Sequence, residues 1–319
     1  MTAEEGPDAG AGSGGGGDGG DGPTRFGFVA LIGAPNAGKS TLVNLLVGAK
    51  VSIVTHKVQT TRSRIRGILS VGRSQIVLVD MPGVFAPRRR LDRAMVDAAW
   101  SGAHDADVVA VLVDAAKGID ENVGRILSRV GLVASAPPLL LLNKVDLVAK
   151  EKLLALTSEL NAAVNFAETF MISALTGDGV DVLRDDLAGR VPPGPWHYSD
   201  DDLSDAPLRF LAAEITREKL FLRLHQEIPY ASSVETTSWK TVRKGAIRIE
   251  QTIFVERASQ KQIVLGKGGR TIKAISMEAR AEIAGIVGTD VHLFLFVKVR
   301  EGWGNDPERY RELGLEMPD

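Results

Sequence analysis

Short apolar runs alternate with amphipathic stretches from Phe26 to about Leu187. The apolar runs have the length of buried β-strands, and the stretches between them carry apolar residues at helical spacing. The predicted strands are Phe28–Ile32, Ile65–Leu69, Gln75–Val79, Val108–Val113, Leu139–Leu142 and Phe170–Ile172, and the predicted helices are Leu91–Trp100, Glu121–Val130, Glu151–Leu160 and Val180–Leu187. This alternation predicts an α/β domain with a mostly parallel, doubly wound sheet over residues 24–190.

The pattern changes after residue 190. Residues 191–206 begin Val-Pro-Pro-Gly-Pro and continue into an Asp-rich run, which cannot extend a helix and indicates a linker. A second order of elements then follows: a helix at Leu208–His225, strands at Ala231–Trp239 and Ala246–Val255, a helix–Gly-Lys-Gly-Gly–helix segment at 258–285, and a strand at Val291–Val299. This α-β-β-α-α-β order predicts a smaller α+β domain over residues 207–303, and residues 304–319 are interpreted as a C-terminal tail.

Composition narrows the class of protein. Residues 1–23 are nearly all Gly, Ala, Asp, Glu and Ser, which predicts a flexible acidic tail and does not fit a signal or transit peptide. The absence of cysteine excludes disulfides and thiolate zinc sites, and it fits a reducing cytoplasm. No apolar run approaches the ~20 residues needed to span a bilayer. The formal net charge of −2 predicts no partner by itself.

A phosphate-binding pattern lies between the first predicted strand and the following helix. Residues 33–41 read Gly-Ala-Pro-Asn-Ala-Gly-Lys-Ser-Thr, which matches G-x-x-x-x-G-K-[ST]. Gly33 and Gly38 allow the loop to curl so that backbone N–H groups face a β-phosphate, and the helix N-terminus adds partial positive charge. Lys39 is a cation for the β- and γ-phosphate oxygens, and the Ser40 hydroxyl is a predicted Mg²⁺ ligand.

Two further motifs indicate that the base is guanine. Asn143-Lys-Val-Asp146 directly follows a predicted strand. There Asp146 can accept the N1–H and N2–H₂ groups of guanine, whereas adenine would leave a buried carboxylate unpaired. We expect Asn143 to tie the site loops together and the stem of Lys144 to lie over the purine ring. Residues 173–175 (Ser-Ala-Leu) follow the next strand and can offer backbone N–H groups to guanine O6.

Two loops between these motifs are predicted to sense the γ-phosphate. Asp80 begins the sequence Asp-Met-Pro-Gly at a strand end, where it would hold Mg²⁺ and the Gly83 N–H could reach the γ-phosphate. The second loop contains Gln59, Thr60, Thr61, Arg62 and Ser63. A threonine there can complete the Mg²⁺ shell, and we favour Thr61 over Thr60. Both loops should order with GTP and relax after hydrolysis to GDP.

The position after Gly83 departs from Ras-like switches. They place a water-orienting glutamine there, whereas this chain has Val84, so we expect slow intrinsic hydrolysis. Asn36 is a candidate ligand for K⁺, which would supply positive charge in place of an arginine finger. The predicted catalytic residues are Lys39, Asn36, Thr61 and Gly83. The predicted GTP-binding residues are Gly33, Ala34, Pro35, Asn36, Ala37, Gly38, Lys39, Ser40, Thr41, Asp80, Met81, Pro82, Gly83, Val84, Asn143, Lys144, Val145, Asp146, Ser173, Ala174 and Leu175.

The second domain carries a G-x-x-G sequence between two predicted helices. This arrangement fits the clamp of a type II KH domain, where glycines let the backbone of single-stranded RNA approach closely. The predicted RNA-binding residues are Gly266, Lys267, Gly268, Gly269, Arg270 and Lys273. The surrounding segment is basic, as expected for a phosphate-rich partner. Its basic residues are Lys240, Arg243, Lys244, Arg248, Arg257, Lys261, Lys267, Arg270 and Lys273, against Glu250 and Glu256.

Together these motifs resemble the Era family of bacterial GTPases, which join such a GTPase domain to a type II KH domain. The resemblance covers about residues 25–310 and includes Val-Ser-Ile-Val-Thr-His-Lys-Val-Gln-Thr-Thr-Arg at residues 51–62. It implies a factor that assists 30S ribosomal subunit assembly and binds small-subunit rRNA near its 3′ end. It also implies a cytoplasmic protein, of which a part associates peripherally with the inner membrane, and a monomer is expected. The N-terminal tail is a departure that the family does not explain.

Two alternatives stay open at this point. The chain could be a constitutive RNA-binding protein whose nucleotide domain is only a scaffold, although the intact Lys39, Ser40, Asp80 and Asp146 argue against it. A membrane-trafficking or signalling GTPase would leave the KH-like domain unexplained, and the chain has no lipidation motif.

Overall fold

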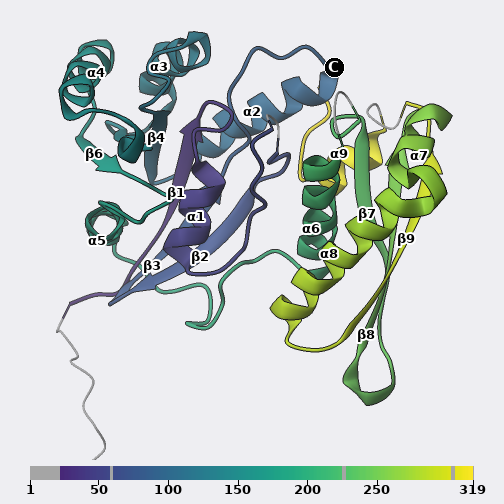
Figure 1. The fold of residues 1–319 in the computed structure, drawn as a ribbon. Helices are drawn as coiled ribbons and strands as arrows, with labels where there is room; N and C mark the ends of the chain where they lie inside the picture. The colour runs from purple at the N-terminus through teal and green to yellow at the C-terminus, as the bar shows by residue number, and fades with distance from the viewer. Residues whose placement is uncertain (1–21, 58–59, 225–227, 303–305, 319) are drawn as a thin grey trace, which may run out of the picture.

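The first part of the chain is a six-stranded sheet covered by helices on both faces (Figure 1). The computed structural model describes residues 22–57, 60–224, 228–302 and 306–318. The strands are β1 (Arg25–Gly33), β2 (Ile65–Val71), β3 (Ser74–Asp80), β4 (Val108–Asp114), β5 (Leu139–Asn143) and β6 (Glu168–Ile172). Their order is β2-β3-β1-β4-β5-β6, and β2 alone runs antiparallel to its neighbour.

Two apolar clusters lie on opposite faces of this sheet. The helices are α1 (Lys39–Val47), α2 (Arg90–His104), α3 (Glu121–Val133), α4 (Lys150–Ala163) and α5 (Val180–Arg190). One cluster joins the strands to α2, α3 and α4, and the other joins them to α1 and α5. Every residue of β3 is buried, as expected when helices cover both faces of a mostly parallel sheet. The predicted α/β class is therefore confirmed, and the loops at the carboxyl ends of the strands share one edge.

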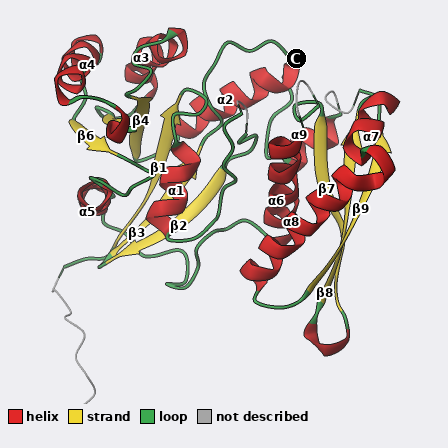
Figure 2. Ribbon diagram, in the orientation of Figure 1, coloured by secondary structure: helices red, strands yellow, loops and turns green. Residues whose placement is uncertain are grey.

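The second part is a three-stranded sheet with three helices packed against it (Figure 2). Its elements are α6 (Leu208–Arg223), β7 (Ser232–Thr241), β8 (Ile247–Val255), α7 (Ala258–Leu265), α8 (Arg270–Val287) and β9 (Val291–Val299). The strand order is β7-β8-β9, with β7 antiparallel and β9 parallel to β8. A parallel neighbour needs a crossover, which α7 and α8 provide. The predicted order of elements is confirmed.

The predicted linker is bonded along the first sheet for most of its length. Val191 is buried, and the Leu203 carbonyl accepts a hydrogen bond from the Ile68 amide of β2 (3.0 Å). The Gln75 side-chain oxygen accepts from the amides of residues 197 and 198, each at 3.0 Å. The prolines directly after α5 end that helix as expected, and several backbone groups of this segment bond to the sheet.

The predicted C-terminal tail contains a short helix, α9 (Pro307–Glu312), that contacts the first domain. Tyr310 and Leu315 are buried against Ala94, Met95 and Ala98 of α2. The chain thus returns to the first domain after completing the second. Most of the predicted acidic N-terminal tail, residues 1–21, lies outside the described residues. Among the helices that the structure describes, none is both long and apolar enough to cross a bilayer.

Candidate nucleotide site and nucleic-acid interface

The phosphate-binding loop curls between β1 and α1, and two of its glycines are required by their surroundings. Gly38 has φ +105°, and a Cβ atom there would lie 2.2 Å from the side-chain nitrogen (Nδ2) of Asn143. A Cβ atom on Gly33 would lie 2.6 Å from the Leu112 carbonyl oxygen. A side chain at either position would displace the loop from the strands beside it, so glycine is needed at both.

Lys39 lies buried at the centre of this loop. Its ammonium donates hydrogen bonds to the carbonyls of Gly33 and Ala34, each at 3.1 Å. Burial lowers the pKa of Lys39 from 10.5 to about 8, although the nearby Asp80 carboxylate acts in the opposite direction. The Lys39 ammonium therefore stays mostly protonated at pH 7. The loop thus holds a cation next to the position expected for the phosphate oxygens.

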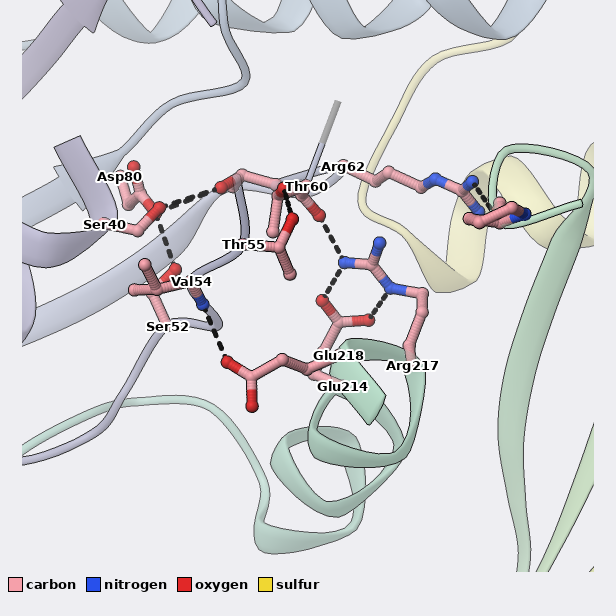
Figure 3. A network of polar contacts seen from close by, with 12 residues as sticks. Ser40, Ser52, Val54, Thr55, Thr60, Arg62, Asp80, Glu214, Arg217 and Glu218 are labelled. Atoms are coloured by element: carbon pink, nitrogen blue, oxygen red, sulfur yellow. Dashed lines mark hydrogen bonds and ion pairs between the residues drawn. The ribbon is translucent and has the colours of Figure 1, made fainter. Parts of the chain in front are cut away.

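The three predicted Mg²⁺ ligands gather around one carboxylate oxygen (Figure 3). Ser40 Oγ donates to Asp80 Oδ2 (2.6 Å), and Thr61 Oγ1 lies 3.3 Å from the same oxygen. Ser52 Oγ also donates to it (2.6 Å), and this serine was not predicted from the sequence. The fully buried Asp80 has a raised pKa because burial disfavours its charge, with Lys39 opposing.

A hard cation fits this cluster. Asp80 Oδ1 is buried and has no hydrogen-bond partner among the described residues. An unpaired buried carboxylate oxygen is costly, and Mg²⁺ prefers carboxylate, hydroxyl and water oxygens. Ser40, Thr61 and Asp80 would therefore hold the ion, which would neutralise phosphate charge when nucleotide binds. Across the described chain no cluster of three His, Asp or Glu side chains has metal-binding geometry, so hydroxyls are the natural companions of Asp80.

The two adjacent threonines of the switch segment point in different directions. Thr61 reaches Asp80, whereas Thr60 Oγ1 bonds to Thr55 Oγ1 (2.7 Å) and to the Lys57 carbonyl (2.8 Å). This placement agrees with the preference for Thr61 as the metal ligand. Gln59, the first residue of the predicted switch segment, lies outside the described residues.

The Asp80–Val84 loop contributes backbone to the site, and two of its side chains face away. Gly83 lines the cavity and packs against Pro35, where a Cβ atom would approach to 3.0 Å. Met81 and Val84 were predicted among the GTP-binding residues, but their side chains lie in the hydrophobic core beneath the sheet edge. The Val84 side chain therefore points into the core and away from the site. This agrees with the expectation that an apolar side chain at this position does not orient water.

The base-recognition loops are tied to the phosphate loop. Asn143 Nδ2 donates to the Ala37 carbonyl (2.8 Å), and its Oδ1 accepts from the Ala174 amide (2.9 Å). Lys144 adopts φ +66° and its ammonium bonds to the Asn36 carbonyl (2.9 Å) and to Asp114 (2.6 Å). Asn143 thus has the bridging position that the sequence predicted. The Lys144 ammonium is thus bonded to the protein at the end of the side-chain stem that was predicted to lie over the purine ring.

The amides predicted to meet guanine O6 are partly engaged. The Ser173 amide donates to the Asp178 carbonyl (2.9 Å), and the Ala174 amide is held by Asn143. Of the three amides, that of Leu175 has no acceptor among the described residues, and the Leu175 side chain is exposed. Asp146 is exposed in the short turn Val145–Leu147. Guanine would therefore meet a carboxylate that is open to solvent before binding.

The phosphate loop borders a cavity of about 470 Å³, large enough for a nucleotide. Several lining residues were not among the predicted site residues, although four of them lie in the stretch at 51–62 that carries the family resemblance. These are Ile53, Val54, Thr55, His56 and Lys117. The first four belong to the segment before the switch, so this loop forms one wall of the site.

The G-x-x-G turn joins α7 to α8 in a tight left-handed path. Gly266 has φ +71° and ψ 171°, a conformation that is nearly restricted to glycine, and Gly268 has φ +62°. Lys267, Arg270 and Lys273 are all exposed. The Arg270 Nε atom donates to the Lys267 carbonyl (3.2 Å), which leaves the rest of its guanidinium to face a phosphate backbone.

Two family models match this chain: a 50S ribosome-binding GTPase model over residues 28–144 and a KH domain model over residues 227–304. GTPase Era of Afipia carboxidovorans is 66% identical over 296 residues, which cover 93% of this chain and 96% of the relative. GTPase Era of a Bradyrhizobium species is 63% identical over 318 residues, covering 100% of this chain and 99% of the relative. This chain belongs to the Era family.

Solved Era structures agree with this assignment. A crystal structure of Era in complex with MgGDPNP and nucleotides 1506–1542 of 16S ribosomal RNA has a TM-score of 0.86 and 34% identity, covering 91% of this chain and 99% of that one. A variant of Aquifex aeolicus Era bound to GDP and AlF4⁻ matches with the same TM-score, identity and coverage. As a member of the Era family, the chain is a GTPase that binds guanine nucleotide with Mg²⁺.

In this Era-family chain the switch segment also contacts the second domain. Arg62 is buried and donates to the carbonyls of Ser232 (2.7 Å), Pro229 (3.1 Å) and Tyr230 (3.0 Å). From α6, Arg217 donates to the Thr60 carbonyl (2.5 Å). Figure 3 shows the bond from Arg217 to Thr60 and the side chain of Arg62 extended toward the second domain. Thr61, between these two residues, contacts Asp80 (3.3 Å).

Further hydrogen bonds connect α6 and the residue after it to the segment that precedes the switch, residues 50–57. The Val54 amide donates to Glu218 (2.9 Å), and Lys50 pairs with the same carboxylate (2.7 Å). The Lys57 ammonium bonds to the carbonyls of Phe221 and Leu224. No sequence pattern pointed to these contacts, because their partners lie more than 150 residues apart in the chain.

Replacing glycines of the Era-family clamp should have unequal effects. A Cβ atom at Gly266 would lie 2.1 Å from Thr271 Oγ1, whereas at Gly268 it would meet nothing within 4 Å. We expect Gly266→Ala to cost about 1–3 kcal/mol in stability from backbone strain plus this contact, and Gly268→Ala to cost about 1 kcal/mol from its left-handed backbone alone. Thermal unfolding of both variants tests this order. Equal losses would contradict it.

Proposed function

We propose that this GTPase is a nucleotide-controlled RNA-binding factor that assists assembly of the 30S ribosomal subunit. It would use residues 24–190 as the switch and the clamp in residues 207–303 to hold small-subunit rRNA near its 3′ end. The Era relative solved with nucleotides 1506–1542 of 16S rRNA supports the RNA partner. We keep the nucleotide-binding and RNA-binding residues predicted from the sequence, except the buried side chains of Met81 and Val84, and add Ser52 as a neighbour of Asp80.

One observation carries the proposal: a single stretch of chain serves both domains. Thr61 contacts the Asp80 carboxylate, while the residues on either side of it bond to α6 and to the loop after α6. A γ-phosphate and Mg²⁺ would draw Thr61 toward the ion, because its hydroxyl would change from a carboxylate contact to a metal ligand. The bonds of Thr60 and Arg62 would transmit that movement to the RNA-binding domain.

The test is the affinity for RNA in two nucleotide states. A fluorescent RNA with the sequence of the small-subunit 3′ end is titrated with full-length protein in a non-hydrolysable GTP analogue and in GDP. We expect the two affinities to differ by at least about fivefold, the lower end of usual coupling energies. The variant Arg62→Met should reduce this difference, and Arg64→Met, a nearby half-buried arginine, serves as a control. Equal affinities in wild type would refute the coupling.

The proposal includes K⁺ as an activator at Asn36. This residue adopts φ +64° in the phosphate loop, and its Nδ2 donates to the His56 carbonyl (2.8 Å), which leaves its side-chain oxygen for a cation. We expect GTP turnover in KCl to exceed that in NaCl by at least about fivefold, because fixed positive charge beside the phosphates stabilises the transition state. Asn36→Gly keeps the backbone permitted and should remove the difference. Turnover that is equal in both salts would contradict K⁺ activation.

The family resemblance extends the proposal to location and assembly state. We expect a cytoplasmic monomer, of which a part associates peripherally with the inner membrane. Sedimentation velocity of the purified protein tests the monomer. Recovery of the protein in salt-washable membrane fractions tests the association, and its complete absence from membranes would remove that part of the proposal.

A further inference from the structure

Two phenylalanines of β9 lie exposed side by side on the second sheet. The burial pattern alternates along the strand, with Leu293 and Val297 buried toward the helices and Phe294 and Phe296 on the other side. Phe294 is 42% exposed and Phe296 47%. Residues two apart on a strand are about 6.6 Å apart, so the two side chains project from the same side of the strand one after the other, as an apolar step. Exposed aromatic pairs of this kind mark interaction surfaces.

Two cationic side chains, Arg248 and Lys298, lie at the two ends of this step. In the sheet register His292 lies opposite Arg248, and Phe254 opposite Lys298. The Arg248 guanidinium carbon lies 4.4 Å from the Phe294 ring centroid. We use the name β9 face for the exposed set Arg248, His292, Phe294, Phe296 and Lys298.

The acidic side chains on the same side of the sheet leave this charge in excess. They are Glu235 on β7 and Glu250 on β8, and Arg248 bonds to Glu250 at 2.8 Å. Lys240, which pairs in register with Arg248, is exposed and adds a further cation at this end of the sheet. The pattern of exposed aromatic rings among basic groups suits a polyanion with stackable bases.

We propose that the β9 face is a second binding surface for single-stranded RNA, separate from the G-x-x-G clamp. Bases would stack on Phe296 and, with Arg248 displaced from its ring, on Phe294, and Arg248 and Lys298 would meet the phosphates. The clamp lies between α7 and α8, on the helical side of the sheet, and such clamps hold about four nucleotides. A longer strand leaving the clamp would reach the β9 face around the sheet edge, where β9 is the last strand. This inference rests on the proposed RNA-binding function.

The experiment compares RNA length with the loss of the rings. Full-length protein with a non-hydrolysable GTP analogue is titrated with fluorescent oligouridines of about 5 and about 25 nucleotides, the shorter sufficient for the clamp alone. We expect the double variant Phe294→Ala/Phe296→Ala to bind the long RNA at least about tenfold more weakly, because each stacked base contributes about 1–3 kcal/mol. Its affinity for the short RNA should match that of wild type.

Matched variants make the outcome specific. Phe294→Trp/Phe296→Trp should retain the long-RNA affinity, and Leu132→Ala, which removes an exposed apolar side chain on α3, should have no effect. Unchanged binding of the long RNA by the double alanine variant overturns the inference while the proposed function stands. Failure of wild type to bind the long oligouridine also overturns the inference, whereas the proposed function fails only if wild type does not bind the RNA of the small-subunit 3′ end. Unchanged RNA binding with lost co-sedimentation on small subunits would identify a protein-docking face and also overturn the inference.

Discussion

Replacing Lys39 with alanine should lower kcat/KM for GTP hydrolysis at least about a thousandfold, which corresponds to about 4 kcal/mol of transition-state stabilisation. The loop holds this ammonium buried between the carbonyls of Gly33 and Ala34. Charge that develops on the phosphate oxygens would lose a fixed, buried cation, and charges act more strongly in buried positions than in water. The effect should therefore exceed that of any other single substitution in the site.

The measurement is steady-state phosphate release with nucleotide affinity determined in parallel. Lys152→Ala removes an exposed lysine of α4 and should leave both quantities unchanged. If Lys39→Ala lost GTP hydrolysis but kept the wild-type RNA affinity and its cellular activity, the chain would fit the scaffold alternative better than a switch. A variant that still hydrolysed GTP at the wild-type rate would show that the cation acts elsewhere.

The second large effect should come from a buried ion pair on α6. Both oxygens of Glu214 accept hydrogen bonds from Arg217, and the two residues are 5% and 2% exposed. Arg217→Met would leave the buried Glu214 carboxylate without its ion-pair partner. It would also remove the hydrogen-bond donor to the Thr60 carbonyl. We expect the free energy of unfolding to fall by about 3–5 kcal/mol, the usual result of breaking a buried pair on one side.

The double variant Glu214→Leu/Arg217→Met distinguishes the cost of an unpaired buried charge from the loss of the ion pair itself. Removing both charges leaves no unpaired carboxylate, so most of the lost stability should return. Because a two-domain chain need not unfold in one step, hydrogen exchange of α6 amides is measured beside urea unfolding. Losses that simply add in the double variant would contradict the predicted coupling between the two side chains.

The nucleotide motifs could be placed from sequence because each follows a strand that its apolar run identifies. Strand ends of a parallel sheet share one edge, so Lys39, Asp80 and Asn143 were expected to converge there. Ser52 gave no such signal, since a serine in a segment without regular structure has many ordinary roles. Its contact with the Asp80 carboxylate joins residues 28 positions apart in the chain, so only the folded structure shows it.

The contacts between domains were beyond the reach of a single sequence. Arg62 was noticed as a neighbour of Thr61, but its acceptors are backbone carbonyls of residues 229–232, which carry no side-chain signature. The engaged Ala174 amide was missed for a similar reason, because backbone donors look free in any motif. Side-chain chemistry is visible in a sequence, whereas the partners of main-chain groups depend on the fold.

The bonded segment 191–206 limits how the second domain can turn. Ser204 Oγ donates to the Arg66 carbonyl (2.8 Å), Asp205 pairs with the Arg66 guanidinium (2.9 Å), and α6 begins at Leu208. Only Ala206 and Pro207 lie between these anchors and the helix, and proline fixes one of the backbone angles. Because Tyr310 and Leu315 also pack on α2, the second domain is held to the first at two places. A rotation about residues 206–207 would therefore have to break the contact with α2 or move α2 with it.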